Sequence, residues 1–343
     1  MSGTIYYISG LAILFGINLI AVWGLDLQFG MTGINSFAFI VFQSAGAYAT
    51  ALLALKPPSS YGSFETYIGG ANLPFPLPLI GGAVAGGLIA VPIGLVAVRR
   101  LRGDYEAMAL LVVSLIATGL VNAQTNWLNG PSGIALVPQP FGGPTVPPQT
   151  YHWIFLGITA VCCVIAWWVM RGIARAPLGR LLRAARDSES AASALGRSPH
   201  RLRMTALIVG GALAGLSGGL LVEYVTAWSP ASWLYQETFL FFTALVVGGR
   251  GNLAGAALGV LIVPIGIAEA TRRLPSFGYP GLIDSLDFVA IGALMLAFLW
   301  FRPNGLLAER KRIIRPRDGS DPASDPAPLG LAARLGLRRA GSR

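Results

Sequence analysis

Long apolar runs, separated by short polar or basic stretches, dominate the chain. A helix that crosses a membrane needs about 20 consecutive apolar residues. The runs that reach or approach this length are residues 5–23, 37–55, 77–98, 107–121, 153–170, 204–225 and 286–300. Together with one further apolar region, they predict an all-α fold: a polytopic transmembrane helix bundle of about 8–10 spans.

The further apolar region, residues 239–270, is interrupted by the sequence GGRGN at residues 248–252. Arg250 would be unfavourable against lipid, and Gly248, Gly249 and Gly251 beside it permit a sharp turn. Irregular backbone at membrane depth is tolerated only where protein or water surrounds it. We therefore predict one broken or re-entrant region, with its turn buried in protein or facing the cytoplasmic interface.

The composition agrees with a membrane protein. Hydrophobic residues make up 54% of the chain and charged residues only 12%, whereas soluble domains carry roughly 25% charge. So little charge could not cover a water-exposed surface, and lipid must cover part of it. The formal net charge of +10 falls mainly in short clusters between apolar runs and near the C-terminus. Membrane orientation sets such a pattern, so we expect no nucleic-acid partner.

The basic clusters orient the predicted bundle. They lie within residues 99–102, 171–203 and 310–317, and all should be cytoplasmic because Lys and Arg accumulate on that side. The segment 122–152 contains no Lys or Arg and should lie outside. Counting spans from these positions places the N-terminus outside as well.

The chain divides into two parts that differ in composition. Residues 1–309 contain all the apolar runs and form the predicted transmembrane domain. Residues 310–343 are rich in Pro, Ala, Asp, Ser and Arg and lack a strong apolar period. Such a composition cannot bury enough apolar surface to fold, so we expect a basic, disordered cytoplasmic tail.

Glycines recur at helical spacing in two spans. Gly211, Gly215 and Gly219 lie four residues apart, and Gly251 and Gly255 repeat this interval. Residues four apart share one helix face, and small residues there let backbones approach closely. These glycines predict tight helix packing, which any polytopic protein can use.

A few polar residues lie within or beside the apolar runs. We take Gln43, Asn122 and Gln124 as candidates for lining a translocation pathway. Acids such as Glu223 and Asp287 lie near the ends of spans, where they can reach the interface and serve only structure.

The segment 179–196, GRLLRAARDSESAASALG, combines a helical pattern with small residues between two spans. Gly196 and the proline that follows it are helix-stop signals, so a short helix outside the membrane is predicted. A face of small residues would let a partner approach closely. An ordinary positive-inside loop explains the composition equally well.

This segment resembles the ATPase-contacting loop of branched-chain amino acid ABC transporter permeases, in particular the LivM-type subunit. Further stretches that are similar to this family occur in the family's order: GLDLQFGMTG at 24–33, GAY at 46–48, LRGDY at 101–105, VGGRGNLAG at 247–255 and FRPNGL at 301–306. Residues 35–40 and 127–133 depart from the family pattern. Both stretches lie where solute contact is plausible.

The resemblance implies a permease subunit of an ATP-driven importer in the bacterial inner membrane. Its solute would be a branched-chain or related amino acid; urea or a short amide is the alternative. Expected partners are cytoplasmic ATPase subunits, a second homologous permease subunit, an external solute-binding protein and the lipid bilayer. The residues expected to contact the ATPase are Arg183, Arg186, Glu189, Ala191, Ala192, Leu195 and Gly196.

Two other classes of protein fit less well. An ion-coupled secondary transporter needs carboxylates near the bilayer midplane, and the central spans of this sequence carry none. A membrane enzyme would need paired carboxylates, a metal cluster or a nucleophile–base set, and the sequence suggests no such set. The phosphate-binding pattern G-x-x-x-x-G-K-S/T is also missing from the sequence, so we expect no catalytic residue, cofactor or metal, and ATP hydrolysis by a separate chain.

Overall fold

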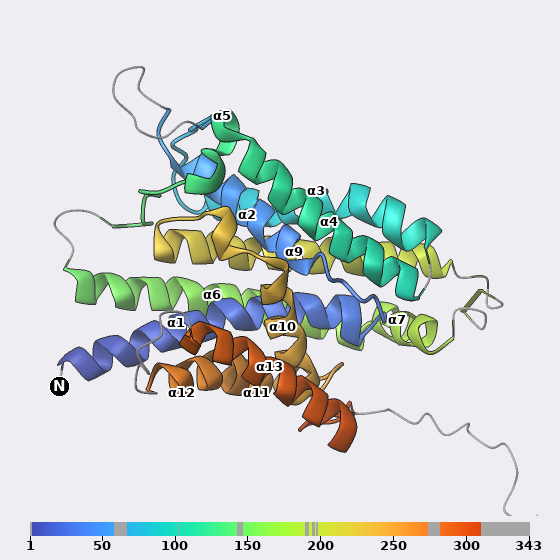
Figure 1. The fold of residues 1–343 in the computed structure, drawn as a ribbon. Helices are drawn as coiled ribbons and strands as arrows, with labels where there is room; N and C mark the ends of the chain where they lie inside the picture. The colour runs from blue at the N-terminus through green and yellow to red at the C-terminus, as the bar shows by residue number, and fades with distance from the viewer. Residues whose placement is uncertain are drawn as a thin grey trace, which may run out of the picture. The chain divides into compact units, whose positions relative to one another are not determined.

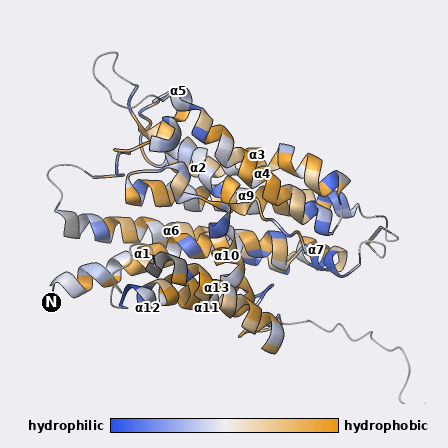
Figure 2. Ribbon diagram, in the orientation of Figure 1, coloured by the Kyte–Doolittle hydropathy of each residue, from blue (hydrophilic) through white to orange (hydrophobic). Residues whose placement is uncertain are grey.

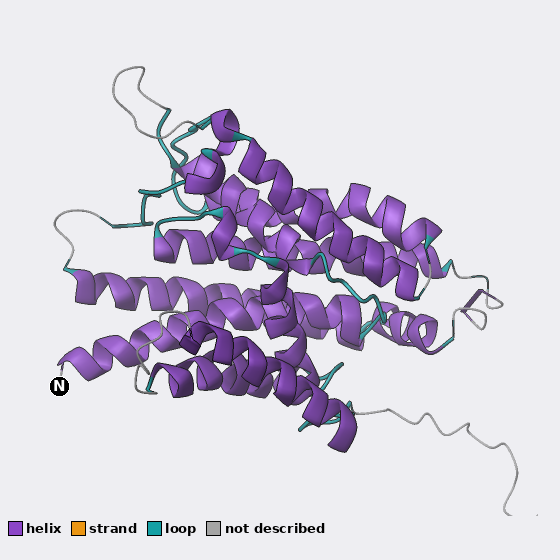
Figure 3. Ribbon diagram, in the orientation of Figure 1, coloured by secondary structure: helices purple, strands orange, loops and turns teal. Residues whose placement is uncertain are grey.

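The computed structural model describes residues 2–57, 67–101, 103–142, 147–188, 192–193, 196, 198–273 and 282–309. Within these ranges the regular structure is helical, and apart from isolated bridges no β-strand occurs (Figure 3). Glu189, Ala191 and Leu195, which the sequence singled out, lie outside the described residues, as does the predicted tail Arg310–Arg343. All helices named below belong to the unit Met1–Glu309.

Helices follow one another along the chain much as the apolar runs predict (Figure 1). The longer ones are α1 (Ser2–Leu25), α2 (Phe39–Ala54), α3 (Leu77–Arg100), α4 (Asp104–Ala123), α6 (Pro148–Arg175), α9 (Pro199–Val225), α10 (Tyr235–Gly248) and α13 (Leu282–Phe301). Shorter elements are the π-helical turn Asp26–Gly30, α5 (Thr125–Leu128), α7 (Pro177–Asp187), α11 (Leu253–Val260), the π-helical turn Leu261–Ile267 and α12 (Ala268–Arg272).

Six of the described helical segments are long and apolar enough to cross a membrane. They are Gly3–Gly30, Leu77–Arg99, Asp104–Ala123, Thr150–Arg175, Pro199–Val225 and Leu253–Arg272. Phe39–Ala54 and Leu286–Phe301 are shorter apolar helices. The prediction of an all-α polytopic transmembrane bundle is therefore confirmed.

The predicted break lies between α10 and α11. Helix α10 ends at Gly248, and Gly249 and Gly251 adopt left-handed φ angles of 118° and 75°, which favour glycine. Asn252 then caps α11, because its side-chain oxygen accepts a hydrogen bond from the Ala254 N–H at 3.1 Å. The long apolar region is thus two helices joined by a glycine turn, as the sequence predicted.

Many large apolar residues are exposed on the helices of the bundle. The same helices are coloured largely as hydrophobic in the ribbon of Figure 2. Leu88 and Val96 of α3 and Val164 of α6 are each 63% exposed, and Trp168 of α6 is 73% exposed. Exposed apolar area on this scale would make a water-soluble protein aggregate. Lipid tails are the natural covering for these faces.

Helix α9 lies at the centre of the bundle and contacts its neighbours through glycine. A Cβ built on Gly215 would lie 2.4 Å from the carbonyl oxygen of Gly82 in α3. A Cβ on Gly46 of α2 would lie 2.2 Å from the Cα of Gly215. Gly211 makes the same kind of contact with Gly86, and Gly219 packs against α2. Gly211 and Gly215 therefore lie where backbones touch, and Gly219 lies against the side chains of Thr50 and Leu79.

Candidate functional site

Helix α7 folds back directly from the end of α6. Ala176 is extended, as residues before proline usually are, and Pro177 occupies the first turn of α7. A Cβ on Gly179 would lie 2.4 Å from the carbonyl oxygen of Ile173, so only glycine permits this close return. The turn fixes α7 against the end of α6 that the basic clusters assign to the cytoplasm.

The helix ends earlier than the stop signal at Gly196 suggested. Helix α7 finishes at Asp187, and Ser188 is extended with φ −159° and ψ 108°. Asp and Ser favour helix ends because their side chains compete for backbone hydrogen bonds. Gly196 does adopt a left-handed φ of 72°, but it lies beyond α7 and marks a later turn.

Two different faces run along α7. Gly179, Leu182 and Ala185 are buried, with Leu182 only 1% and Ala185 only 2% exposed. Three exposed residues at helical spacing form the opposite face, which we call the outer face of α7: Arg180, Ala184 and Asp187. The sequence had not singled out this face.

Arg183 and Arg186 turn toward their own chain and bind Glu309. Arg183 Nε lies 2.7 Å from Glu309 Oε1, a charge contact whose N–H is not aligned for a hydrogen bond. Arg186 Nη2 donates to Glu309 Oε2 at 3.0 Å, and Arg186 Nη1 donates to the carbonyl oxygen of Gly30. Burial works against the charge of Arg186, but hydrogen bonding and attraction from Glu309 and Asp187 outweigh it and raise the pKa of Arg186.

The segment that carries Glu309 packs against the glycine turn between α10 and α11. The chain after α13 runs along this break, where Leu306 N–H donates to Val247 O at 2.9 Å and Leu307 N–H donates to Gly248 O at 3.0 Å. A Cβ on Gly251 would lie 2.9 Å from the Glu309 carboxyl carbon. Gly251 therefore serves both the left-handed turn and the approach of Glu309.

The end of α1 joins the same contact. Asp26, which is fully buried, accepts a hydrogen bond from Gly251 N–H at 2.7 Å. Gly33, with φ 74°, lies against the side chain of Arg186. Four segments that are far apart in sequence therefore meet: residues 26–33, helix α7, residues 248–252 and residues 302–309. We call this meeting point the anchor site.

Of the remaining predicted coupling residues, the structure describes Ala192 and Gly196, which lie beyond the end of α7 in sequence. Ala192 is only 4% exposed, and Gly196 is exposed with no atom near enough to touch an added Cβ. Their proposed contact with an ATPase remains a prediction.

The predicted pathway residues do not gather in one place. Gln43 is 1% exposed, and its amide donates to Ser217 Oγ at 2.8 Å, joining α2 to α9. Asn122 and Gln124 are exposed at the far end of α4. In this conformation Gln43 stabilises the packing of α2 against α9.

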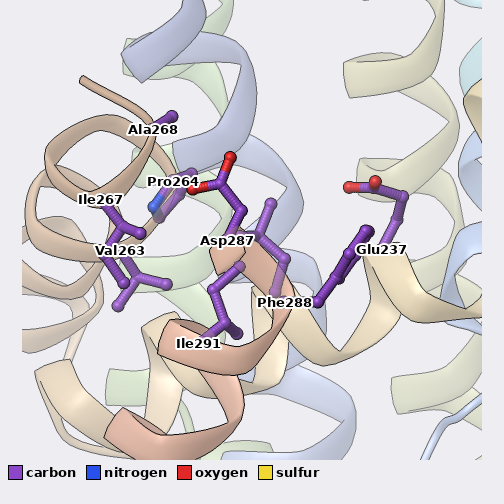
Figure 4. A pocket seen from close by; sticks show the side chains of 9 residues that line it. Glu237, Val263, Pro264, Ile267, Ala268, Asp287, Phe288 and Ile291 are labelled. Atoms are coloured by element: carbon purple, nitrogen blue, oxygen red, sulfur yellow. The ribbon is translucent and has the colours of Figure 1, made fainter. Parts of the chain in front are cut away.

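A cavity of about 330 Å³ lies between α10, the Leu261–Ile267 turn and α13. Figure 4 shows the carboxyl groups of Glu237 and Asp287 at its edge, beside the apolar side chains of Phe288 and Ile291. Glu237 belongs to the first turn of α10, where the helix dipole favours negative charge. No pattern in the sequence indicated this cavity, because most of its walls come from segments that are apolar throughout.

Taken together, the apolar outer faces, the broken span and the amphipathic helix outside the spans define a polytopic membrane protein with a built anchor for one exposed helix. Residues 7–299 match the family model described as "Branched-chain amino acid transport system / permease component". The chain belongs to this permease family, and the resemblance seen in the sequence is confirmed.

Curated relatives carry the same description. The high-affinity branched-chain amino acid transport system permease protein LivM of Escherichia coli is 27% identical over 89% of this chain and 71% of its own length. The probable branched-chain amino acid transport permease protein LivM of Methanocaldococcus jannaschii is 27% identical over 90% of this chain and 95% of its own length. The high-affinity branched-chain amino acid transport system permease protein BraD of Pseudomonas aeruginosa is 27% identical over 88% of this chain and 94% of its own length. No solved structure matches the chain.

Proposed function

We propose that this chain is a permease subunit of an ABC importer that moves branched-chain or related amino acids across the bacterial inner membrane. Its relatives are named for branched-chain amino acid transport, and this supports the solute class. ATP hydrolysis is carried by a separate cytoplasmic subunit. A second homologous permease subunit and an external solute-binding protein complete the assembly.

The observation that carries the proposal is the construction of α7. The helix lies outside the apolar spans, its inner face is buried and anchored, and its outer face offers Arg180, Ala184 and Asp187 to a partner. The small side chain of Ala184 permits a partner to approach closely, and the charged residues on either side of it can fix the partner's register through charge pairs. The permease would receive the movement of the ATPase at this face.

The test is uptake by the reconstituted complex in proteoliposomes. We expect ATP-dependent uptake of leucine, isoleucine or valine when the solute-binding protein is present. Competition by urea or a short amide, with no competition by amino acids, would transfer the assignment to an amide permease. Uptake that needs an ion gradient and ignores ATP would contradict the importer class.

A matched pair of variants tests the role of α7. Ala184→Trp should abolish association with the ATPase subunit, because the bulky ring fills the outer face. Ala123→Trp, at an exposed alanine on the last turn of α4, should leave association with the ATPase unchanged because the topology places it on the opposite side of the membrane. Normal association and uptake in the Ala184→Trp permease would remove α7 from the coupling contact.

A further inference from the structure

One carboxylate links helix α7 to the rest of the protein. Glu309 is 14% exposed, and its two oxygens contact Arg183 and Arg186, whose side chains are 28% and 19% exposed. The two arginines are three residues apart and therefore lie on one side of α7. Partial burial reduces screening by water and salt, so these contacts are stronger than ordinary surface ion pairs.

The carboxylate is itself fixed by backbone contacts. The two hydrogen bonds from Leu306 and Leu307 tie its segment to the last turn of α10. Arg186 also reaches the carbonyl oxygen of Gly30 beyond α1, and Asp26 near that position holds Gly251. A displacement of α7 would thus act at once on the ends of α1, α10 and α13.

On the outer face of α7, Asp187 accepts a hydrogen bond from Arg186 Nε at 3.2 Å, so this face touches the anchor site through one residue. Glu309 contacts Arg183 and Arg186 and is itself 14% exposed, so an ATPase that binds the outer face at Arg180 and Ala184 would not compete with it. Docking at Arg180 and Ala184 is therefore separate from transmission at Glu309, and Asp187 joins the two through Arg186.

We propose that Glu309 is a positioning residue that transmits movement of α7 to the ends of α1, α10 and α13, an inference that rests on the proposed role of α7 in binding an ATPase. Because the Glu309 carboxylate binds two arginines of α7, the helix and the ends of α1, α10 and α13 move together. Without the charge of Glu309, α7 would still bind the ATPase, but its movement would no longer displace the ends of these helices.

The experiment compares three permeases in the complete complex: Glu309→Gln, Glu309→Asp and the control Asp104→Asn, an exposed acid in the first turn of α4. Three quantities are measured: association with the ATPase, ATP hydrolysis, and solute taken up per ATP hydrolysed. Glu309→Gln should retain association and hydrolysis while uptake per ATP falls about tenfold, a change in coupling within the range known for residues between two sites. Glu309→Asp should recover part of the loss, and Asp104→Asn should behave as the wild type.

A covalent rescue keeps the test decisive if Glu309→Gln folds poorly. In a chain without its native cysteines, Arg183→Cys and Glu309→Cys together remove the ionic link, and a short bis-methanethiosulfonate cross-linker restores it covalently, because each cysteine thiolate displaces a methanesulfinate and forms a disulfide to the linker. Cross-linking should raise uptake per ATP above that of the same protein before cross-linking. An unchanged ratio would overturn the proposal.

The remaining outcomes also decide. Wild-type coupling in Glu309→Gln would show that the ion pairs do not transmit movement. Loss of ATPase association in Glu309→Gln would place Glu309 in the docking surface and overturn its positioning role. If the wild-type complex itself shows no ATP-dependent uptake, the proposed function fails and the result is distinguishable from failure of the Glu309 inference.

Discussion

Adding one methyl group where α9 crosses α3 should destabilise the whole bundle. In Gly215→Ala the new Cβ would lie 2.4 Å from the carbonyl oxygen of Gly82 and 3.0 Å from the Cα of Gly86. Both neighbours are backbone atoms, so no side chain can rotate away to make room. The helices themselves would have to separate.

The size of the effect follows from that separation. An ordinary contact begins at 3.4 Å, so α3 and α9 must move apart by about 1 Å, a gap that forfeits a quarter to a half of the dispersion energy between facing atoms. Overpacking of well-packed cores typically costs about 1–3 kcal/mol. We expect Gly215→Ala to lie at the upper end, because Gly46 of α2 packs against the same position.

The assay is thermal unfolding of the purified permease in detergent, followed by tryptophan fluorescence. Gly157→Ala of α6 is the matched control, since nothing lies within 4 Å of its added Cβ. Alanine is favoured over glycine in a helix by up to about 1 kcal/mol, so the control should melt at or above the wild-type temperature. A Gly215→Ala protein that melts as high as the control would refute the backbone contact between α3 and α9.

Two further predictions concern the ion pair at the start of α4 and the orientation of the chain. The Arg203–Glu106 pair is nearly buried, with side chains 10% and 3% exposed. Glu106→Leu alone leaves a buried arginine without its carboxylate and should lower the free energy of unfolding by about 3–5 kcal/mol. Adding Arg203→Met to Glu106→Leu should recover most of that loss, and a denaturation experiment measures both variants. With native cysteines removed, Ser132→Cys should react with an impermeant thiol reagent in intact cells and Ser193→Cys should not, because basic clusters orient the bundle; the opposite labelling would invert the topology.

Residue patterns along single segments predicted much of the fold. Apolar run length located the spans, since the hydrocarbon thickness fixes how many residues must be apolar. Gly249, Gly251 and the intervening Arg250 located the break between α10 and α11, because that combination suits neither a continuous helix nor a lipid-facing surface. Such features depend only on residues that are close together in the sequence and on the properties of the lipid bilayer, which are known in advance.

The anchor site depends on contacts between distant segments and could not be predicted in the same way. Asp26 and Gly251 are separated by 225 residues, and Glu309 reads in the sequence as a single acid before a basic tail. We predicted that Arg183 and Arg186 contact a partner because their segment, 179–196, resembles the ATPase-contacting loop of the permease family. Only the fold shows that a carboxylate of the same chain occupies them.

The glycine stripes show why helix faces are easier to predict than their partners. The four-residue spacing of Gly211 and Gly215 marks a smooth face of α9, but every smooth face in the chain is an equally suitable partner by sequence. The structure pairs α9 with α3 and α2, and pairs the stripe containing Gly255 with Gly248 of α10. The glycine turn makes this second pairing possible, because α11 must reverse direction at once to lie against α10. Chain connectivity therefore chooses the partner of α11, whereas the partners of α9 are set by the packing of the whole bundle.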